Sequence, residues 1–481
     1  MIWLLLYILL LFGIGFQHWL THRGTSLDGF VVYDRQADGF SVGMSLVALA
    51  FGASSVFGLA GWAYQYNLNA LWWTLSGALF LVMLAFTFLE TVWSIKGYTI
   101  GDIIARAFGD HIRFLVSAVL FLAWLMVLAG QIIAGGNILA QFTGSQTWGY
   151  TLFTLIFTGY SLLVGQASTI KTGFLQVLVM VAGLLLLLGL CLSNAPAAVA
   201  ARPPVTFHFG FDDAFTFTLF LGVFIPVGLS YLFGPDMYSR IFLARDVASA
   251  RRGLLLASAT IVLISLIIVA IGILAKGIVT VAKPDLTIQT LANQFFQGSL
   301  GDFVLVALLS IPLSGADIIL ITTGTLLGRD VINHTLRIVG HPLSEKTQVW
   351  LIRACMVLAA ALATGFALRL QAIIPSLLIA YKVFSIGIVP LLFLALLRIR
   401  RSAITAMTGP VTRLVAIYLL LSSLGVLLVE LKFIPLNLPN YSLYLLLGNT
   451  LLLTLLLRLG GSPWHPRGAG DNPSSSQGNA V

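Results

Sequence analysis

The chain has 481 residues, of which 59% are hydrophobic and only 9% are charged, and its formal net charge is +9. Soluble domains contain roughly 25% charged residues, so this composition excludes a soluble protein and predicts an integral helical membrane protein. The basic residues are spread over short loops, so we expect the lipid bilayer as a partner and no nucleic acid. Cys191 and Cys355 lie in apolar runs, and no Cys/His cluster has metal-ligand spacing, so we expect no disulfide, metal or cofactor.

Apolar stretches long enough to cross a bilayer, which takes about 20 residues, predict about thirteen transmembrane helices. Residues 2–17 have neither the basic start nor the small-residue cleavage site of a signal peptide, so we expect a retained first helix. The Gly-, Pro- and Ser-rich end predicts a transmembrane transporter domain over 1–459 and a disordered cytoplasmic tail over 460–481. The predicted spans are 2–19, 39–66, 70–92, 113–138, 148–167, 173–193, 214–236, 252–275, 301–326, 347–369, 372–397, 410–431 and 440–458.

The second span, GFSVGMSLVALAFGASSVFGLAGWAYQYN from Gly39 to Asn67, has small residues crowded into its middle. Glycine weakens a helix interior, so the segment GASSVFGLAG is a poor continuous helix. Non-helical backbone at membrane depth is tolerated only where it is buried in protein or lines a wet cavity. We therefore predict a broken helix that offers carbonyls to an ion and N–H groups to a substrate. The alternative is that the small residues only allow close helix packing.

The seventh predicted span, FTLFLGVFIPVGLSYLFGPDMYSR, carries a second set of interrupting residues, Pro226, Gly228, Gly234 and Pro235. Proline removes an N–H group and clashes one turn back. Breaks in corresponding positions predict two five-helix units, spans two to six and spans seven to eleven. The odd number of helices in a unit makes the second inverted relative to the first. The alternative is a set of proline kinks that only shape the bundle.

Lysine and arginine residues are shared unevenly between the two sets of predicted loops. Loops that follow odd-numbered spans hold most of them, whereas the other loops hold only Arg202, Lys276, Lys283, Arg369 and Lys432. Because cytoplasmic loops are enriched in these residues, we expect the amino terminus outside and the carboxy terminus in the cytoplasm.

Four stretches resemble the sodium:solute symporter family, which has a LeuT-type fold. The similarity runs from about Gly39 to Pro390. The stretches are GASSVFGLAG in span two, YSLLVGQASTIKTGFLQ around spans five and six, PDMYSRIFLARDVASARRG after span seven, and LSGADIILITTGTLLGRD in span nine.

This resemblance implies an all-α integral membrane protein with a 5+5 inverted repeat and flanking helices. It also implies a secondary active transporter that moves a small organic solute across the cell inner membrane by alternating access. The residues themselves favour no enzyme, since no GxSxG, HExxH or paired-acid motif lies at membrane depth.

The resemblance implies a sodium site that combines backbone carbonyls of span two with carbonyl and hydroxyl oxygens of span nine. The matching positions are Ala53, Val56, Ile311, Ser314 and Gly315. Oxygen ligands of this kind suit a hard cation such as Na+.

Three positions depart from the family pattern: Gly315 lacks the second hydroxyl, Gly173 replaces an aspartate, and Ser55 replaces an acidic or amide residue. Sodium symport therefore stands beside two alternatives. One is a proton-coupled or uncoupled transporter with a degraded sodium site. The other is a membrane solute sensor, which would need a separate signalling partner.

Few ionisable residues lie deep in predicted spans, and two of them, Glu90 and Arg353, are close to cytoplasmic ends and are expected to be structural. The other two are Asp317 in span nine and Lys382 in span eleven. Intramembrane charges often mark ion or substrate pathways, so we assign both to coupling. A structural ion pair between them, or a snorkelling lysine, is the alternative. Substrate contacts implied by the family fall on an aromatic and weakly polar set, which favours a small neutral or singly charged solute: Phe57, Trp62, Ser76, Tyr231 and Lys382.

Overall fold

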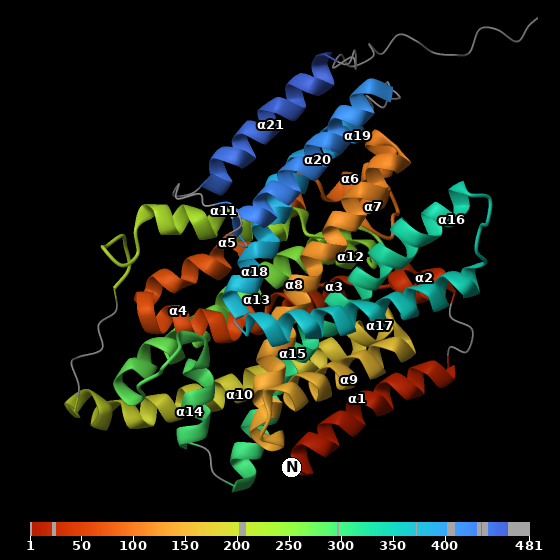
Figure 1. The fold of residues 1–481 in the computed structure, drawn as a ribbon. Coiled ribbons are helices and arrows are strands. Elements are labelled where there is room, and N and C mark those ends of the chain that lie inside the picture. The colour runs from red at the N-terminus through yellow and green to blue at the C-terminus, as the bar shows by residue number, and fades with distance from the viewer. Residues whose placement is uncertain are drawn as a thin grey trace, which may run out of the picture.

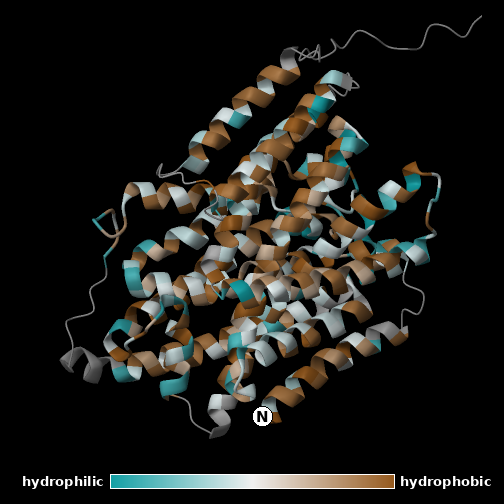
Figure 2. Cartoon of the chain, in the orientation of Figure 1, coloured by the Kyte–Doolittle hydropathy of each residue, from teal (hydrophilic) through white to brown (hydrophobic). Residues whose placement is uncertain are grey.

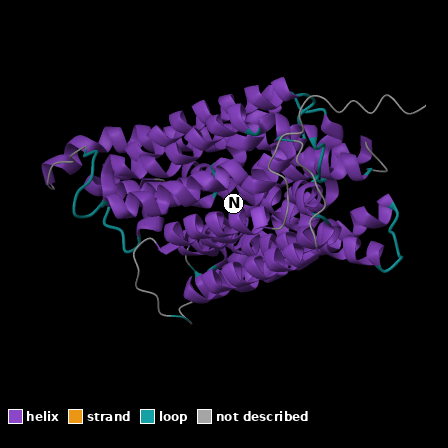
Figure 3. Cartoon of the chain, turned by 90° about the horizontal axis from the view of Figure 1, so that it is seen from above, coloured by secondary structure: helices purple, strands orange, loops and turns teal. Residues whose placement is uncertain are grey.

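The computed structural model describes residues 2–21, 26–201, 208–295, 298–371, 373–401, 409–430, 434 and 441–459. Helices account for nearly all of this described part, and it contains no β-strand (Figures 1 and 3). The predicted disordered tail over 460–481 lies outside the described residues. Cys191 and Cys355 are free, buried thiols.

The longer helices follow one another along the chain with short segments between them. Their bounds are α1 Ile2–Thr21, α3 Gly39–Ala50, α4 Leu59–Tyr66, α5 Leu71–Thr87, α6 Leu89–Ser94, α7 Ile100–Phe108, α8 Asp110–Thr143, α9 Gln146–Val164, α10 Gln166–Ala201, α11 Phe217–Phe233, α12 Pro235–Phe242, α13 Val247–Ile278, α14 Thr287–Phe295, α15 Gly298–Thr325, α17 Glu345–Leu370, α18 Ile373–Val383, α19 Val389–Arg400, α20 Gly409–Glu430 and α21 Tyr441–Leu459. The remaining described elements are the short helices α2 Leu27–Val32 and α16 His334–Ile338, the π-helical turns η2 Ser54–Gly58, η5 Leu326–Asn333 and η6 Phe384–Ile388, and the 3-10 turns η1 Tyr33–Arg35, η3 Asn67–Ala70 and η4 Pro284–Leu286.

Every predicted span coincides with at least one of these helices, which confirms the all-α membrane fold. Among the described residues, 9 helices are long and apolar enough to cross a membrane. Three shorter apolar helices cover Ile2–Gln17, Gly39–Ala50 and Tyr441–Leu457. The total of thirteen transmembrane helices stays a prediction.

The break in the second span is present. Helix α3 ends at Ala50, and Phe51 leaves helical geometry with φ −93° and ψ 54°. The chain resumes as the π-helical turn η2 and then as α4. Small residues and an interruption therefore coincide, as the sequence predicted.

The break in the seventh span lies at its last two interrupting residues. Gly234 is extended, with φ −62° and ψ 138°, and Pro235 starts α12. Pro226, in contrast, lies inside a continuous α11. Proline at the first helical position loses no hydrogen bond, which is why Pro235 can begin a new helix so abruptly.

Contacts between helices define two groups. In the first, α13 contacts α3, α4 and α5, and α11 contacts α5. In the second, α8 contacts α9, α15 and α17. Helix α10 lies between the groups against α3, α13 and α15, and α18 contacts α8. The two broken helices belong to the first group, and α8 and α15 of the second group face them.

Hydrophobic residues predominate along the helices, as expected for spans in a bilayer (Figure 2). Large hydrophobic side chains there are exposed, among them Ile2, Leu9, Phe86, Leu155 and Leu421. Arginines gather at one end of the helices, where the segment before α3, the segments after α5 and α12, and the end of α19 meet. We name this the arginine-rich end; α7 and α16 lie there, and α14 lies at the opposite end (Figure 1).

Candidate functional site

A small cavity of about 30 Å³ lies where the two broken helices meet, and we name it the central cavity. It receives residues from the break after α3, from α5, α8, α11, α12, α15 and α18. Its polar and aromatic lining residues are Ser54, Ser55, Trp73, Gln131, Tyr231, Asp236 and Tyr381. Such a convergence of interrupted helices in mid-membrane is where transporters of this architecture bind their cargo.

Of the predicted substrate residues, Tyr231 lines the central cavity and the other four lie elsewhere. The Ser76 hydroxyl donates to the carbonyl of Phe224 at 2.5 Å. The Trp62 ring packs against Tyr66 and Trp73 with centroids 5.2 and 5.5 Å apart. Phe57 is a core side chain, 3% exposed.

Lys382 turns away from the central cavity. Its ammonium nitrogen lies 2.8 Å from Glu430 Oε1 at the end of α20, and Tyr441 donates its hydroxyl proton to the same carboxylate. The ion pair that we considered with Asp317 therefore forms with Glu430 instead. This contact ties α18 to the flanking helices α20 and α21.

Asp317 is completely buried and hydrogen-bonded inside the second helix group. The Tyr160 hydroxyl donates to its Oδ2 at 2.8 Å, and the Ile318 amide donates to its Oδ1 at 2.7 Å. Asp317 is absent from the central cavity lining, so it can act only through neighbouring groups.

Ser314 and Ile311 come together with a carbonyl of the second span. The Ser314 hydroxyl lies 2.8 Å from the Ile311 carbonyl and 3.0 Å from the Ala48 carbonyl. Three oxygens from α3 and α15 therefore converge, which is the donor set that a hard cation takes. The oxygen that the second span contributes to this group is the carbonyl of Ala48, five residues before the predicted Ala53.

Ala53 and Val56 make other contacts. The Ala53 amide donates to Gln131 Oε1 at 2.8 Å. The Val56 carbonyl accepts a hydrogen bond from the Leu59 amide within the helix. The break offers its oxygens on the α3 side because the last carbonyls of a helix have no intrahelical partner.

Gln131 is a site residue that sequence reasoning missed. A Cβ atom placed on Gly52 would lie 2.4 Å from Gln131 Nε2, and one placed on Gly315 would lie 3.1 Å from it. The amide therefore fills the space that Gly52 and Gly315 leave open between the two helix groups. A buried glutamine within the long apolar helix α8 was the available signal.

Arg240 is a second residue that the sequence did not single out as a site. Its side chain is fully buried. It donates to Ser45 Oγ and Thr169 Oγ1, both at 2.9 Å, and to Gln166 Oε1. The guanidinium thereby links α12 to α3 and α10.

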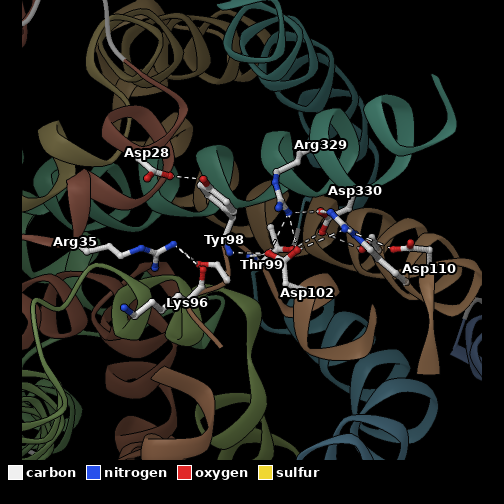
Figure 4. A network of polar contacts seen from close by, with 12 residues as sticks. Asp28, Arg35, Lys96, Tyr98, Thr99, Asp102, Asp110, Arg329 and Asp330 are labelled. Carbon is white, nitrogen blue, oxygen red and sulfur yellow. Dashed lines mark hydrogen bonds and ion pairs between the residues drawn. The ribbon is translucent and has the colours of Figure 1, made fainter. Parts of the chain in front are cut away.

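The arginine-rich end is closed by a network of buried charges (Figure 4). Asp330 in η5 is fully buried and lies 2.5 Å from Arg113 Nη2 and 3.0 Å from Arg329 Nη1. The Thr99 hydroxyl donates to the same carboxylate. Asp102 in α7 lies 3.0 Å from Arg329 and 3.5 Å from Arg113. The network joins α7, α8 and η5.

The opposite end contains a larger cavity of about 580 Å³, the outer cavity. It lies between the last turns of α8, the helix α14 and the start of α18. Its lining is rich in amides and holds few charges; the polar side chains are Asn137, Gln141, Gln146, Lys283, Asp285, Gln289, Thr290, Asn293 and Gln371.

The described geometry can be compared with known proteins. A model of the sodium:solute symporter family matches residues 30–412. This chain belongs to the sodium:solute symporter family. This chain is 24% identical over 354 residues to a sodium/pantothenate symporter of Haemophilus influenzae, a match that covers 68% of this chain and 71% of that protein.

A second relative is the sodium/iodide cotransporter of Homo sapiens, 29% identical over 191 residues. That match covers 39% of this chain and 30% of the cotransporter, so the chain spans less than a third of that relative's length.

Solved structures share the fold at low sequence identity. An outward-open, substrate-bound sodium-coupled sialic acid symporter has a TM-score of 0.73 at 14% identity, over 94% of this chain and 97% of that chain. A nucleobase-cation-symport-1 family transporter in a closed conformation has a TM-score of 0.58 at 16% identity, over 90% and 94% of the two chains. The fold is the LeuT-type fold, and the family and fold are those of ion-coupled membrane transporters rather than enzymes.

Proposed function

We propose that this protein is a sodium-coupled symporter of a small organic solute, working by alternating access in the cell inner membrane. The observation that carries the proposal is the meeting of two interrupted helices at the central cavity, next to the oxygens of Ala48, Ile311 and Ser314. The amino terminus faces outward, and the arginine-rich end faces the cytoplasm, because cytoplasmic loops concentrate Lys and Arg.

The sodium ion is cargo in this scheme. The carbonyls of Ala48 and Ile311 and the hydroxyl of Ser314 bind it, and its binding draws α3 toward α15. Gly315 supplies no hydroxyl, so we expect weaker sodium binding than a site with a second side-chain oxygen would give. Asp317 positions α15 through Tyr160.

The test is solute uptake into proteoliposomes with sodium and proton gradients imposed separately, after thermal-shift screening has identified a solute. We expect uptake to follow the sodium gradient. Ser314→Ala removes one of three oxygens and should raise the sodium concentration for half-maximal uptake by about tenfold, the effect of roughly 1.4 kcal/mol.

Ser310→Ala is the matched control. Ser310 is also buried in α15, one turn earlier, and its hydroxyl donates to the carbonyl of Ala307 at 2.7 Å. The sodium concentration for half-maximal uptake by the Ser310→Ala variant should stay at the wild-type value. Uptake that follows only the proton gradient, or a Ser314→Ala variant with unchanged sodium dependence, would contradict sodium coupling. Solute binding without uptake under either gradient would identify a solute sensor instead.

A further inference from the structure

The central cavity contains one charged side chain, the carboxylate of Asp236. Asp236 follows the break at Gly234 and Pro235 and lies in the first turn of α12. It is 8% exposed, and the Met237 amide donates to its Oδ1 at 3.1 Å. A carboxylate has lone pairs for about four hydrogen bonds, so this group keeps acceptor capacity for a ligand in the cavity.

No lysine or arginine lines this cavity among the described residues. Two basic residues lie close in sequence to cavity residues, but their side chains have partners outside the cavity. Arg240, one turn after Asp236, donates to Ser45, Thr169 and Gln166. Lys382, which follows the cavity residue Tyr381, is paired with Glu430. An anionic solute would therefore meet a carboxylate and find no cation to hold it.

Three aromatic rings share the cavity with this carboxylate. They come from Trp73 on α5, Tyr231 on α11 and Tyr381 on α18. The faces of aromatic rings attract cations, and Trp and Tyr do so best. A carboxylate that lies among aromatic rings is the environment that holds an ammonium group.

We propose that the central cavity selects a small solute with a single positive charge, an organic ammonium compound whose charged group is held by Asp236 and the three rings. This inference rests on the proposed function, since it names the class of solute that the symporter carries. The present volume of about 30 Å³ has room for about two waters, so the solute enters when the helices around the cavity move apart.

The test uses isosteric probes that differ in charge. Choline, its neutral isostere 3,3-dimethyl-1-butanol and the anion 3,3-dimethylbutanoate are titrated into the purified full-length protein in nanodiscs, without any gradient. Methylammonium and ethanolamine extend the cationic set. The readout is the dissociation constant from tryptophan fluorescence, to which Trp73 contributes, and from calorimetry.

In the wild-type protein we expect at least one ammonium compound to bind at least about tenfold more tightly than its neutral counterpart, because the neutral compound loses the ionic attraction to Asp236 and the cation–π attraction to the rings. Asp236→Asn should abolish this preference to within about twofold. Glu90→Gln is the control, since Glu90 is an exposed carboxylate paired with Arg251 outside the cavity. It should keep the wild-type preference.

Folding of the Asp236→Asn variant is checked by its unliganded melting temperature and gel filtration. A second pair of variants leaves Asp236 in place and tests the contribution of an aromatic ring. Tyr381→Leu should weaken ammonium binding relative to the neutral isostere, whereas Tyr381→Phe should retain it, because phenylalanine keeps the ring face.

The proposal is overturned if no ammonium compound binds, if the neutral or anionic probe binds as tightly, or if Asp236→Asn keeps the preference. These outcomes are separate from failure of the proposed function. Sodium-driven uptake of an anion or a neutral solute would keep the symporter and overturn the charge selectivity. Ammonium binding without uptake under any gradient would overturn transport and keep the charge selectivity.

Discussion

The two ends of the helix bundle are held in different ways. At the arginine-rich end, Asp330 and Asp102 are buried among Arg113 and Arg329, and a carboxylate there has at least two cationic partners. At the opposite end the outer cavity is lined mainly by amides, and the contact across it from Gln289 Nε2 to the Asn137 carbonyl is 3.3 Å long.

The two kinds of contact differ in strength. Breaking a buried ion pair leaves an uncompensated charge, whereas a neutral hydrogen bond of this kind contributes about 1 kcal/mol. We interpret the arginine-rich end as the more firmly held of the two. In the proposed alternating-access cycle, the charge network separates in the state that opens the arginine-rich end.

The largest effect is expected from Asp330→Ala. The substitution leaves Asp102 as the one largely buried carboxylate described beside Arg113 and Arg329, and breaking a buried pair costs about 3–5 kcal/mol. The measurement is denaturant or thermal unfolding in detergent. Asp110→Asn is the control, because Asp110 lies 3.8 Å from Arg113 but its side chain is 61% exposed, and such pairs contribute about 0–1 kcal/mol. Equal losses in both variants would contradict a network held by Asp330.

The next largest effect is expected on access to the central cavity from the arginine-rich end. Arg329 donates to both Asp102 and Asp330, and its guanidinium lies 4.3 Å from the centre of the Tyr98 ring. The measurement is the rate at which a thiol reagent, added from the arginine-rich side, labels the cysteine of a Ser54→Cys variant in the central cavity. Arg329→Ala should increase this labelling rate about tenfold, which corresponds to roughly 1.4 kcal/mol.

The matched variant at the opposite end is Gln289→Ala, which removes the hydrogen bond to the Asn137 carbonyl. Labelling from the arginine-rich side should change less than twofold. If both variants accelerate labelling equally, the two ends do not differ as we infer.

A smaller effect is expected at Lys382 and Glu430, a partly buried ion pair that joins α18 to α20. Lys382→Met alone leaves the carboxylate unpaired and should destabilise the protein by about 1–3 kcal/mol, whereas Lys382→Met with Glu430→Gln should restore part of this loss. A double-mutant cycle in thermal unfolding measures the coupling. If the pair is structural, the Lys382→Met variant keeps the sodium dependence of uptake of the wild type. If uptake by this variant follows a different ion, Lys382 has the coupling role that the sequence predicted.

The smallest effect is the pH dependence at Asp102. Burial opposes ionisation of this carboxyl, but the guanidinium groups of Arg329 and Arg113 outweigh it and lower its pKa. Because the pKa of Asp102 is lower in the folded protein than the ordinary aspartate value near 4, its ionised form stabilises the folded state at pH values above about 4. This stabilisation is lost as the pH falls through the lowered pKa.

The melting temperature of the wild type and of Asp102→Asn, measured from about pH 6 down to pH 3, tests this sign. The gap between the two should narrow as the pH falls. A gap that widens toward acid would mean that Asp102 is stabilised in its protonated form, and the charge network would need another description.

The sequence by itself determined the helices and both interruptions. Apolar length and Gly or Pro content act within one or two turns, so the ranges of the spans, the end of α3 near Gly52 and the break at Gly234 could be read directly. The resemblance to the family, carried by short local stretches, is also confirmed by the match over residues 30–412.

The tertiary structure alone decided which side chains face the cavities. The rotation of each helix is set by its neighbours, so the sequence could not reveal that Asp236 and Gln131 enter the central cavity while Trp62 and Ser76 do not. The partner of Lys382 lies 48 residues further along the chain, and that of Arg113 lies 217 residues away. Such pairings depend on packing between distant helices, which no local pattern records.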